Sequence, residues 1–235
     1  MKNLGTTLLL VCVASLGACS RQEPAAPVAA SAPQAAAQPA PAAPPPADEA
    51  PVQLSPELVA RLQRPHSPVL GAAKARVTVV EVLDPACEAC RAFAPVVEQL
   101  LFLYPEDVRV VVRFANFHPP SQEAIRLLEA SRQQGKFHEA LNALFERQQE
   151  WANHSAPEPG RVWQIAGEVG VDVARARKAA NAPGINKFLT QEAEDLVALK
   201  VERTPTFFVN GKLLVAFGPQ QLFALVKEEV GKAAK

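Results

Sequence analysis

The chain has 235 residues, 49% of them hydrophobic, and its 24 lysines and arginines equal its 24 aspartates and glutamates in number. This balance gives no chain-wide field that would attract nucleic acid or an anionic surface, so we expect no nucleic-acid partner.

The N-terminus has the layout of a secretory signal. Lys2 precedes an apolar run over residues 4–16, which is too short to span a membrane, and small residues follow it. The letters "LGAC" at residues 16–19 resemble the lipobox of bacterial lipoproteins, whose cysteine is lipidated and becomes the mature N-terminus. We therefore predict a signal peptide over residues 1–18 and a lipid anchor on Cys19. The alternatives are an ordinary signal with a chance cysteine and a short internal helix.

An alanine- and proline-rich segment follows. Residues 24–51 have no apolar periodicity that would drive a core, and their prolines favour an extended chain. We predict a lipidated tether over residues 19–54. The remaining residues, 55–235, are enough for one domain with a sizeable core.

The first half of this domain contains two buried strands. "SPE" at residues 55–57 is a helix start, with a capping serine and a proline at the first position. "RVTVVEVLD" at 76–84 and "VRVVVRF" from residue 108 are typical of strands buried on both faces. Between them, apolar residues recur at helical spacing: Phe93, Val96, Val97, Leu100 and Leu101.

The second half begins with a helical block over residues 121–200. Glycines interrupt this block into several helices. "TFFVNGKLLVAF" at 206–217 is a hairpin, because Asn210-Gly211 joins two apolar runs, and a last helix follows Pro219. The order of elements predicts an α/β fold with helices covering a mixed sheet.

Cys87 and Cys90 form the remaining thiol pair, because Cys12 leaves with the predicted signal and Cys19 carries lipid. A disulfide between them closes too small a loop to be a useful staple. They lie at the start of the predicted helix, where free backbone N–H groups and the helix dipole stabilise an anion, so we expect a lowered pKa for Cys87. Cys90 can then resolve a mixed disulfide. Zinc is the chemical alternative, but it prefers four ligands, and neither a second cysteine pair nor a short histidine spacing is found.

The cysteine motif "DPACEACRAF" at 84–93 and "RTPTFFVNGK" at 203–212 resemble the thioredoxin-fold disulfide oxidoreductases of the bacterial envelope, specifically the DsbA-like group. The resemblance covers about residues 66–232. It implies a thioredoxin fold, with a mixed central sheet flanked by helices and an inserted helical subdomain over about 121–200. It also implies a cis peptide bond between Thr204 and Pro205, beside the sulfurs and in contact with clients.

The same resemblance gives Glu81 a role in exchanging protons with Cys90. A carboxylate inside an apolar strand has a raised pKa and can act as a general base. A solvent-facing glutamate at a strand end is the alternative.

The sequence departs from this group between the cysteines. Strongly oxidising members resemble "CPHC", whereas this chain has Glu88 and Ala89. Glu88 disfavours a second negative charge and Ala89 supplies no donor, so the Cys87 thiolate should be less stabilised. We therefore predict a weaker oxidant than the archetypal member.

Together these features predict a membrane-anchored periplasmic thiol–disulfide oxidoreductase without cofactor or metal. Its partners would be cysteine-containing envelope proteins, a membrane redox partner and, through the anchor, the lipid bilayer. Oxidase, reductase and isomerase directions all fit, and so do the inner and outer membranes. The alternative function is a binding lipoprotein that uses a thioredoxin scaffold to hold a partner or metal.

Overall fold

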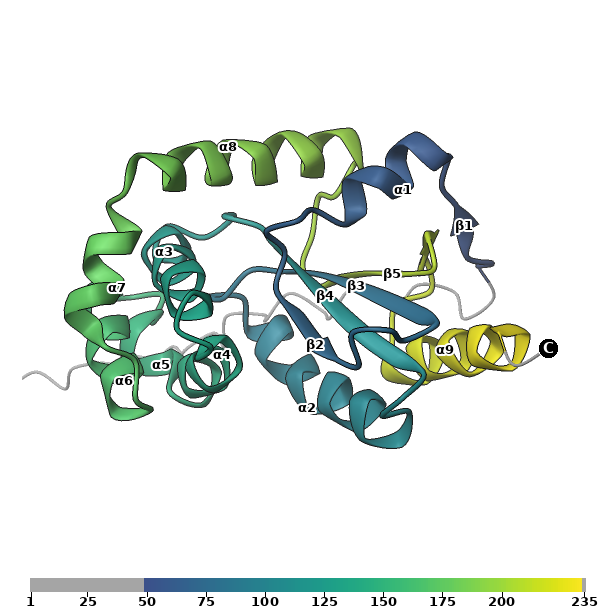
Figure 1. Cartoon of the computed structure of the whole chain (residues 1–235), viewed down its shortest axis with the longest axis horizontal. Helices are drawn as coiled ribbons and strands as arrows, with labels where there is room; N and C mark the ends of the chain where they lie inside the picture. The colour runs from purple at the N-terminus through teal and green to yellow at the C-terminus, as the bar shows by residue number, and fades with distance from the viewer. Residues whose placement is uncertain (1–48, 234–235) are drawn as a thin grey trace, which may run out of the picture. The chain divides into compact units, whose positions relative to one another are not determined.

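The computed structural model describes residues 49–233, and within them six strands form one mixed sheet in the order β1-β6-β5-β3-β4-β2 (Figure 1). The strands are β1 (Val52–Gln53), β2 (Val69–Gly71), β3 (Val77–Leu83), β4 (Val108–Phe114), β5 (Thr206–Val209) and β6 (Lys212–Leu213). Strands β3 and β4 pair in parallel, and the other neighbours pair antiparallel.

The helices lie before, between and after these strands. They are α1 (Pro56–Leu62), α2 (Glu88–Leu103), α3 (Ser121–Arg132), α4 (Phe137–Glu146), α5 (Gln148–Trp151), α6 (Val162–Glu168), α7 (Val173–Ala180), α8 (Pro183–Ala198) and α9 (Pro219–Ala233), with a short 3-10 turn at Pro159–Arg161.

Strand β3 is the centre of the sheet, and all seven of its residues are buried. Alternate residues of a strand point to opposite faces. On one face, Val77 and Val79 join a core with α2 and α9. On the other face, Val80 and Val82 join a core with α1 and α8. The sheet is therefore covered on both sides (Figure 1), as its nearly continuous apolar strands predicted.

Helices α3 to α8 form the insertion between β4 and β5. Its core includes Trp151 and Trp163, both buried, and Trp151 donates its indole N–H to the carbonyl of Leu144 at 2.9 Å. This core is continuous with Leu83 and the two cysteines. The predicted α/β thioredoxin fold with inserted helices is confirmed.

The N-terminal part of the described chain departs from the prediction. Ser55 caps α1 as expected, by accepting a hydrogen bond from the backbone of Leu58. Two short strands, β1 and β2, were not predicted. Strand β1 lies inside the range predicted as tether, and Val52 pairs with Leu213 of β6. Two residues are too few to show a periodic pattern, and their pairing depends on a strand about 160 residues away.

The hairpin between β5 and β6 turns at Asn210-Gly211, as predicted. Both residues have positive φ, 48° and 80° respectively. Asn210 tolerates this region and Gly211 adopts it without cost, which is why this dipeptide favours a two-residue turn.

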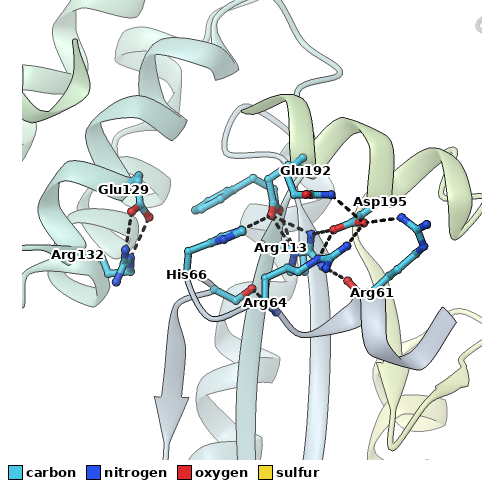
Figure 2. A network of polar contacts seen from close by, with 11 residues as sticks. Arg61, Arg64, His66, Arg113, Glu129, Arg132, Glu192 and Asp195 are labelled. Carbon is cyan, nitrogen blue, oxygen red and sulfur yellow. Dashed lines mark hydrogen bonds and ion pairs between the residues drawn. The ribbon is translucent and has the colours of Figure 1, made fainter. Parts of the chain in front are cut away.

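A buried polar network fastens α1 and α8 to the sheet (Figure 2). Arg113 of β4 is fully buried and contacts two carboxylates of α8: Glu192 at 2.8 Å and Asp195 at 2.9 Å. Arg61 and Arg64 reach Asp195 from α1 and the residues after it, at 3.0 and 2.6 Å. The buried charges of β4 and α8 thus compensate each other.

The arginines control the ionisation of these carboxylates. Burial alone would raise the pKa of Asp195, but hydrogen bonds from Arg64 and Arg113 outweigh it and lower this pKa to about 2. At Glu192, hydrogen bonds from His66 and Arg113 likewise overcome burial and lower the pKa. Both carboxylates are therefore charged at neutral pH.

The predicted signal peptide, the anchor at Cys19 and most of the predicted tether lie outside residues 49–233. Among the helices inside that range, none combines the length and apolar character needed to cross a membrane.

Candidate redox site

The two cysteines lie where β3 ends and α2 begins. Cys87 is the N-cap of α2, and Cys90 is in its first turn. Both are free thiols, with Cys87 8% exposed and Cys90 fully buried. The site therefore leaves Cys87 slightly exposed and encloses Cys90 completely.

The environment of Cys87 stabilises its thiolate. The thiol of Cys90 donates a hydrogen bond to Cys87, and this contact contributes most to lowering the pKa of Cys87 to about 5. Partial burial opposes the shift, while the side chain of Thr204 and the backbone N–H groups of Ala89 and Cys90 reinforce it. These N–H groups are free donors of the helix N-terminus, as the sequence predicted.

Cys90 has the opposite character. Burial raises its pKa most, and the hydrogen bond to Cys87 and the nearby charge of Glu81 raise it further. The backbone N–H of Asp84 donates to the Cys90 sulfur at 3.4 Å and opposes this shift. At neutral pH Cys87 is thus a thiolate and Cys90 a thiol.

Glu81 is buried in β3, with 4% of its surface exposed. Burial raises the pKa of its carboxyl to about 8. It shares the α2 and α9 face of the sheet with Val79, below the start of α2. The solvent-facing alternative is therefore wrong.

The loop before β5 lies against Cys87. The Thr204–Pro205 peptide bond is cis, as the resemblance implied. When Cys87 is protonated, its thiol donates to the carbonyl oxygen of Thr204 at 3.4 Å. Two segments 117 positions apart thus meet at the less deeply buried sulfur.

Asp84, which directly follows β3 and is fully buried, was not predicted as a site residue. One carboxylate oxygen accepts from Ala86 N–H at 2.9 Å and from the Ser121 hydroxyl. The other accepts from Phe117 N–H at 2.7 Å and from the backbone and ring nitrogens of His118. Asp84 therefore joins the cysteine loop to the start of the insertion. Its place in "DPAC", directly after a buried strand, was the available signal.

Glu88 and Ala89 are exposed on the first turn of α2. The Glu88 carboxylate accepts a hydrogen bond from the side chain of Gln149 at 3.1 Å, and His154 Nε2 is 3.7 Å from it. Both partners belong to the insertion.

The remaining histidines have local partners: His66 lies 3.1 Å from Glu192, and His138 contacts Glu98. In the part of the chain that the structure covers, no group of three or more histidine, cysteine, aspartate or glutamate side chains is arranged to hold a metal ion.

Comparison with known proteins gives this geometry a family. The sequence profile described as "Thioredoxin" matches residues 63–228. The chain belongs to the thioredoxin family. A thioredoxin-like oxidoreductase from Silicibacter pomeroyi DSS-3 is 29% identical, with a TM-score of 0.63 over 76% of this chain and 99% of that one.

Other solved structures share the fold at lower identity. BdbD from Bacillus subtilis, in its oxidised form, is 21% identical with a TM-score of 0.62, over 77% of this chain and 97% of that one. The α-DsbA1 of Wolbachia pipientis is 17% identical with a TM-score of 0.64, over 73% of this chain and 94% of that one. The predicted DsbA-like arrangement of the thioredoxin fold is confirmed.

Among curated proteins, the chain is similar to part of a much longer protein. A Na(+)/H(+) antiporter NhaA of Herminiimonas arsenicoxydans is 32% identical over 146 residues, which are 62% of this chain and 22% of that protein. A second NhaA, from Salinispora tropica, matches at 34% over 161 residues, 23% of its length. The chain thus spans about a quarter or less of these relatives, and the similarity does not carry antiport to it.

Proposed function

We propose that this protein is a periplasmic thiol–disulfide oxidoreductase that exchanges disulfides with client proteins through Cys87 and Cys90. The observation that carries the proposal is the contrast between the two sulfurs. Cys87 has a pKa of about 5, whereas burial raises the pKa of Cys90. An accessible thiolate above a protected thiol is the arrangement that exchange requires, because the first attacks and the second resolves.

Reduction of a client proceeds in two displacements. The Cys87 thiolate attacks one sulfur of a client disulfide, which forms a mixed disulfide and releases the other client sulfur as a thiolate. Cys90 then loses its proton and attacks the Cys87 sulfur, which releases the second client thiolate. Two electrons pass from the protein dithiol to the client disulfide, and the reverse sequence oxidises a client dithiol.

Glu81 serves the second displacement as a proton acceptor. Cys90 is protonated at neutral pH, so it needs a base before it can attack. The Glu81 carboxyl has a pKa of about 8, which lets it exchange a proton near neutral pH. Its burial on the Cys90 side of the sheet supports this role.

Clients would bind as extended segments against Thr204 and Pro205. The Thr204 carbonyl is 3.4 Å from the Cys87 sulfur, so a segment paired with this loop would bring its own cysteine to Cys87. We further propose that a signal peptide over residues 1–18 and lipid on Cys19 anchor the domain to a bilayer through the tether. After each reaction, a membrane redox partner would then return Cys87 and Cys90 to the redox state in which they meet the next client.

A trapping experiment tests the proposed function. Cys90→Ala should accumulate mixed disulfides between Cys87 and envelope proteins, because nothing resolves them, and these adducts should appear on non-reducing gels. The double variant Cys87→Ser/Cys90→Ala is the control and should trap none. Wild-type protein should reduce insulin in the presence of a dithiol, and Cys87→Ser should not. A trap without adducts, combined with no insulin reduction, would favour the alternative of a binding lipoprotein with an idle disulfide.

A further inference from the structure

Gln148 of α5 is a buried polar residue that reaches the cysteine loop from the insertion. It is 1% exposed and lies 61 positions after Cys87. Its side-chain amide donates to the carbonyl oxygen of Pro85 at 2.9 Å and to that of Cys87 at 3.1 Å. One amide group therefore bridges both ends of the turn that leads into α2.

The amide of Gln148 can serve this loop in one orientation only. Its oxygen is buried without a hydrogen-bond partner among the described residues. Turning the amide over would bring that oxygen toward the two carbonyl oxygens and lose both hydrogen bonds. A buried acceptor without a partner is costly and calls for an explanation. Here the explanation is that both N–H groups are required on the loop.

The two carbonyls are close to the chemistry. The Cys87 carbonyl also accepts the first hydrogen bond of α2, from Arg91 N–H at 3.2 Å, so its position fixes where the helix N-terminus starts. That N-terminus supplies the N–H groups of Ala89 and Cys90, which stabilise the Cys87 thiolate. A donor on the Cys87 carbonyl also withdraws negative charge from the neighbourhood of the thiolate.

Asp84 and Gln148 hold the same loop from two sides. Asp84 binds Ala86 N–H from its position directly after β3, and Gln148 binds the carbonyls from the insertion. Trp151, on the same short helix, is fully buried and anchors α5. The loop geometry thus depends on the insertion as well as on the sheet.

We propose that Gln148 is a positioning residue for thiol–disulfide exchange, which holds the Pro85 and Cys87 carbonyls so that the Cys87 sulfur stays against Thr204 and the N–H groups of α2. The inference rests on the proposed function for its purpose, but it makes a claim about Cys87 that needs no client. It also assigns the helical insertion a part in the reactivity of Cys87.

The test is a pH titration of the Cys87 thiolate, followed by its ultraviolet absorbance in the reduced protein, with the oxidised protein as blank. Gln148→Met keeps the length of the side chain and removes both donors. We expect the thiolate–thiol equilibrium constant to fall by up to about tenfold, which is the upper end of the net contribution of one neutral hydrogen bond. The Cys87 midpoint should therefore move upward.

One control separates positioning from general loosening. Gln164→Met removes the amide of another glutamine of the insertion, whose side chain donates to Glu168 at 3.2 Å and not to the cysteine loop. This variant should leave the midpoint in place. An unchanged midpoint in Gln148→Met, or an equal shift in Gln164→Met, would overturn the proposal.

Gln148→Asn is the second variant if the methionine variant does not fold. It keeps the amide but is one methylene too short to reach both carbonyls, so a smaller shift in the same direction is expected, and an unchanged midpoint overturns the proposal. Failure of the proposed function would look different. The Cys90→Ala trap would capture no clients, while the Gln148 variants would still move the Cys87 midpoint.

Discussion

Two buried acidic sites lie on opposite faces of the sheet, and their carboxyl pKa values are shifted in opposite directions. Glu192 and Asp195 face α1 and β4, where arginines compensate them and lower the pKa of Asp195 to about 2. Glu81 faces α2, where burial raises its pKa to about 8 without an arginine beside it. The chain therefore pairs its buried charges where they hold helices, and leaves one carboxyl unpaired where a proton must move next to Cys90.

Replacing Arg113 should remove the charge compensation of Glu192 and Asp195 and have the largest effect on stability. Arg113→Met leaves Glu192 and Asp195 buried with fewer positive partners, and we expect a loss of about 3–5 kcal/mol in the free energy of unfolding. Urea denaturation measures it. Arg161→Met is the control, because Arg161 pairs with Glu150 and both side chains are exposed, and it should cost about 1 kcal/mol or less. Equal losses in the two variants would contradict the comparison.

Replacing Glu81 should act on the uncompensated side and depend on pH. The folded-state pKa of Glu81 is about 8, above its ordinary value of 4.5. The unfolded chain therefore loses this proton first, so wild-type stability should fall as pH rises between these two values. Glu81→Gln should remove that slope and be more stable at high pH by on the order of a few kcal/mol. Exposed Glu106→Gln should keep the wild-type slope.

Glu81→Gln should also slow the resolution step of thiol–disulfide exchange. Without a base for Cys90, resolution of the mixed disulfide at neutral pH should slow by roughly 100-fold. Stopped-flow measurement of product release from a Cys87-linked peptide checks this. Attack by Cys87 should keep its rate, because its thiolate is already formed. A variant that is more stable but resolves at the wild-type rate would leave Glu81 without its proposed role.

Glu88 should give the smallest effect. Glu88→Gln removes an exposed carboxylate charge that contacts Gln149 and His154. Because this charge is exposed to solvent, the reduction potential of the Cys87–Cys90 pair should become less negative by only about 10 mV. A tenfold change in the redox equilibrium constant is about 30 mV. Equilibration with glutathione measures the potential. The wild-type potential should be more negative than about −120 mV, the DsbA value. A potential as oxidising as that would contradict the predicted weaker oxidant.

The sequence predicted best those features that are written into neighbouring residues. The buried strands, the capped helix at Ser55 and the Asn210-Gly211 turn each follow from a local pattern, and the structure has all of them. The cis bond before Pro205 came from the family resemblance rather than from a pattern. Strands β1 and β2 were missed, because two or three residues carry too little periodicity.

The sequence could not predict contacts between polar residues that lie far apart in the chain and belong to no recognisable motif. Asp84, Gln148 and Arg113 are ordinary polar residues until the fold buries them. Gln148 reaches the Cys87 carbonyl from 61 positions away, and Arg113 reaches Glu192 from 79. Burial of Glu81 could be inferred, since its whole strand is apolar, but the partners of buried charges depend on the tertiary packing.

The insertion between β4 and β5 has a consequence for engineering. A version trimmed to the minimal thioredoxin core would keep both cysteines, Glu81 and the cis bond before Pro205. It would also lose both carboxylates that meet Arg113, together with the amide that holds the Cys87 carbonyl. An unpaired guanidinium buried in the sheet is a severe cost. Any trimmed version would first need Arg113 replaced by an apolar residue, because the insertion supplies the carboxylates that pair with this buried arginine.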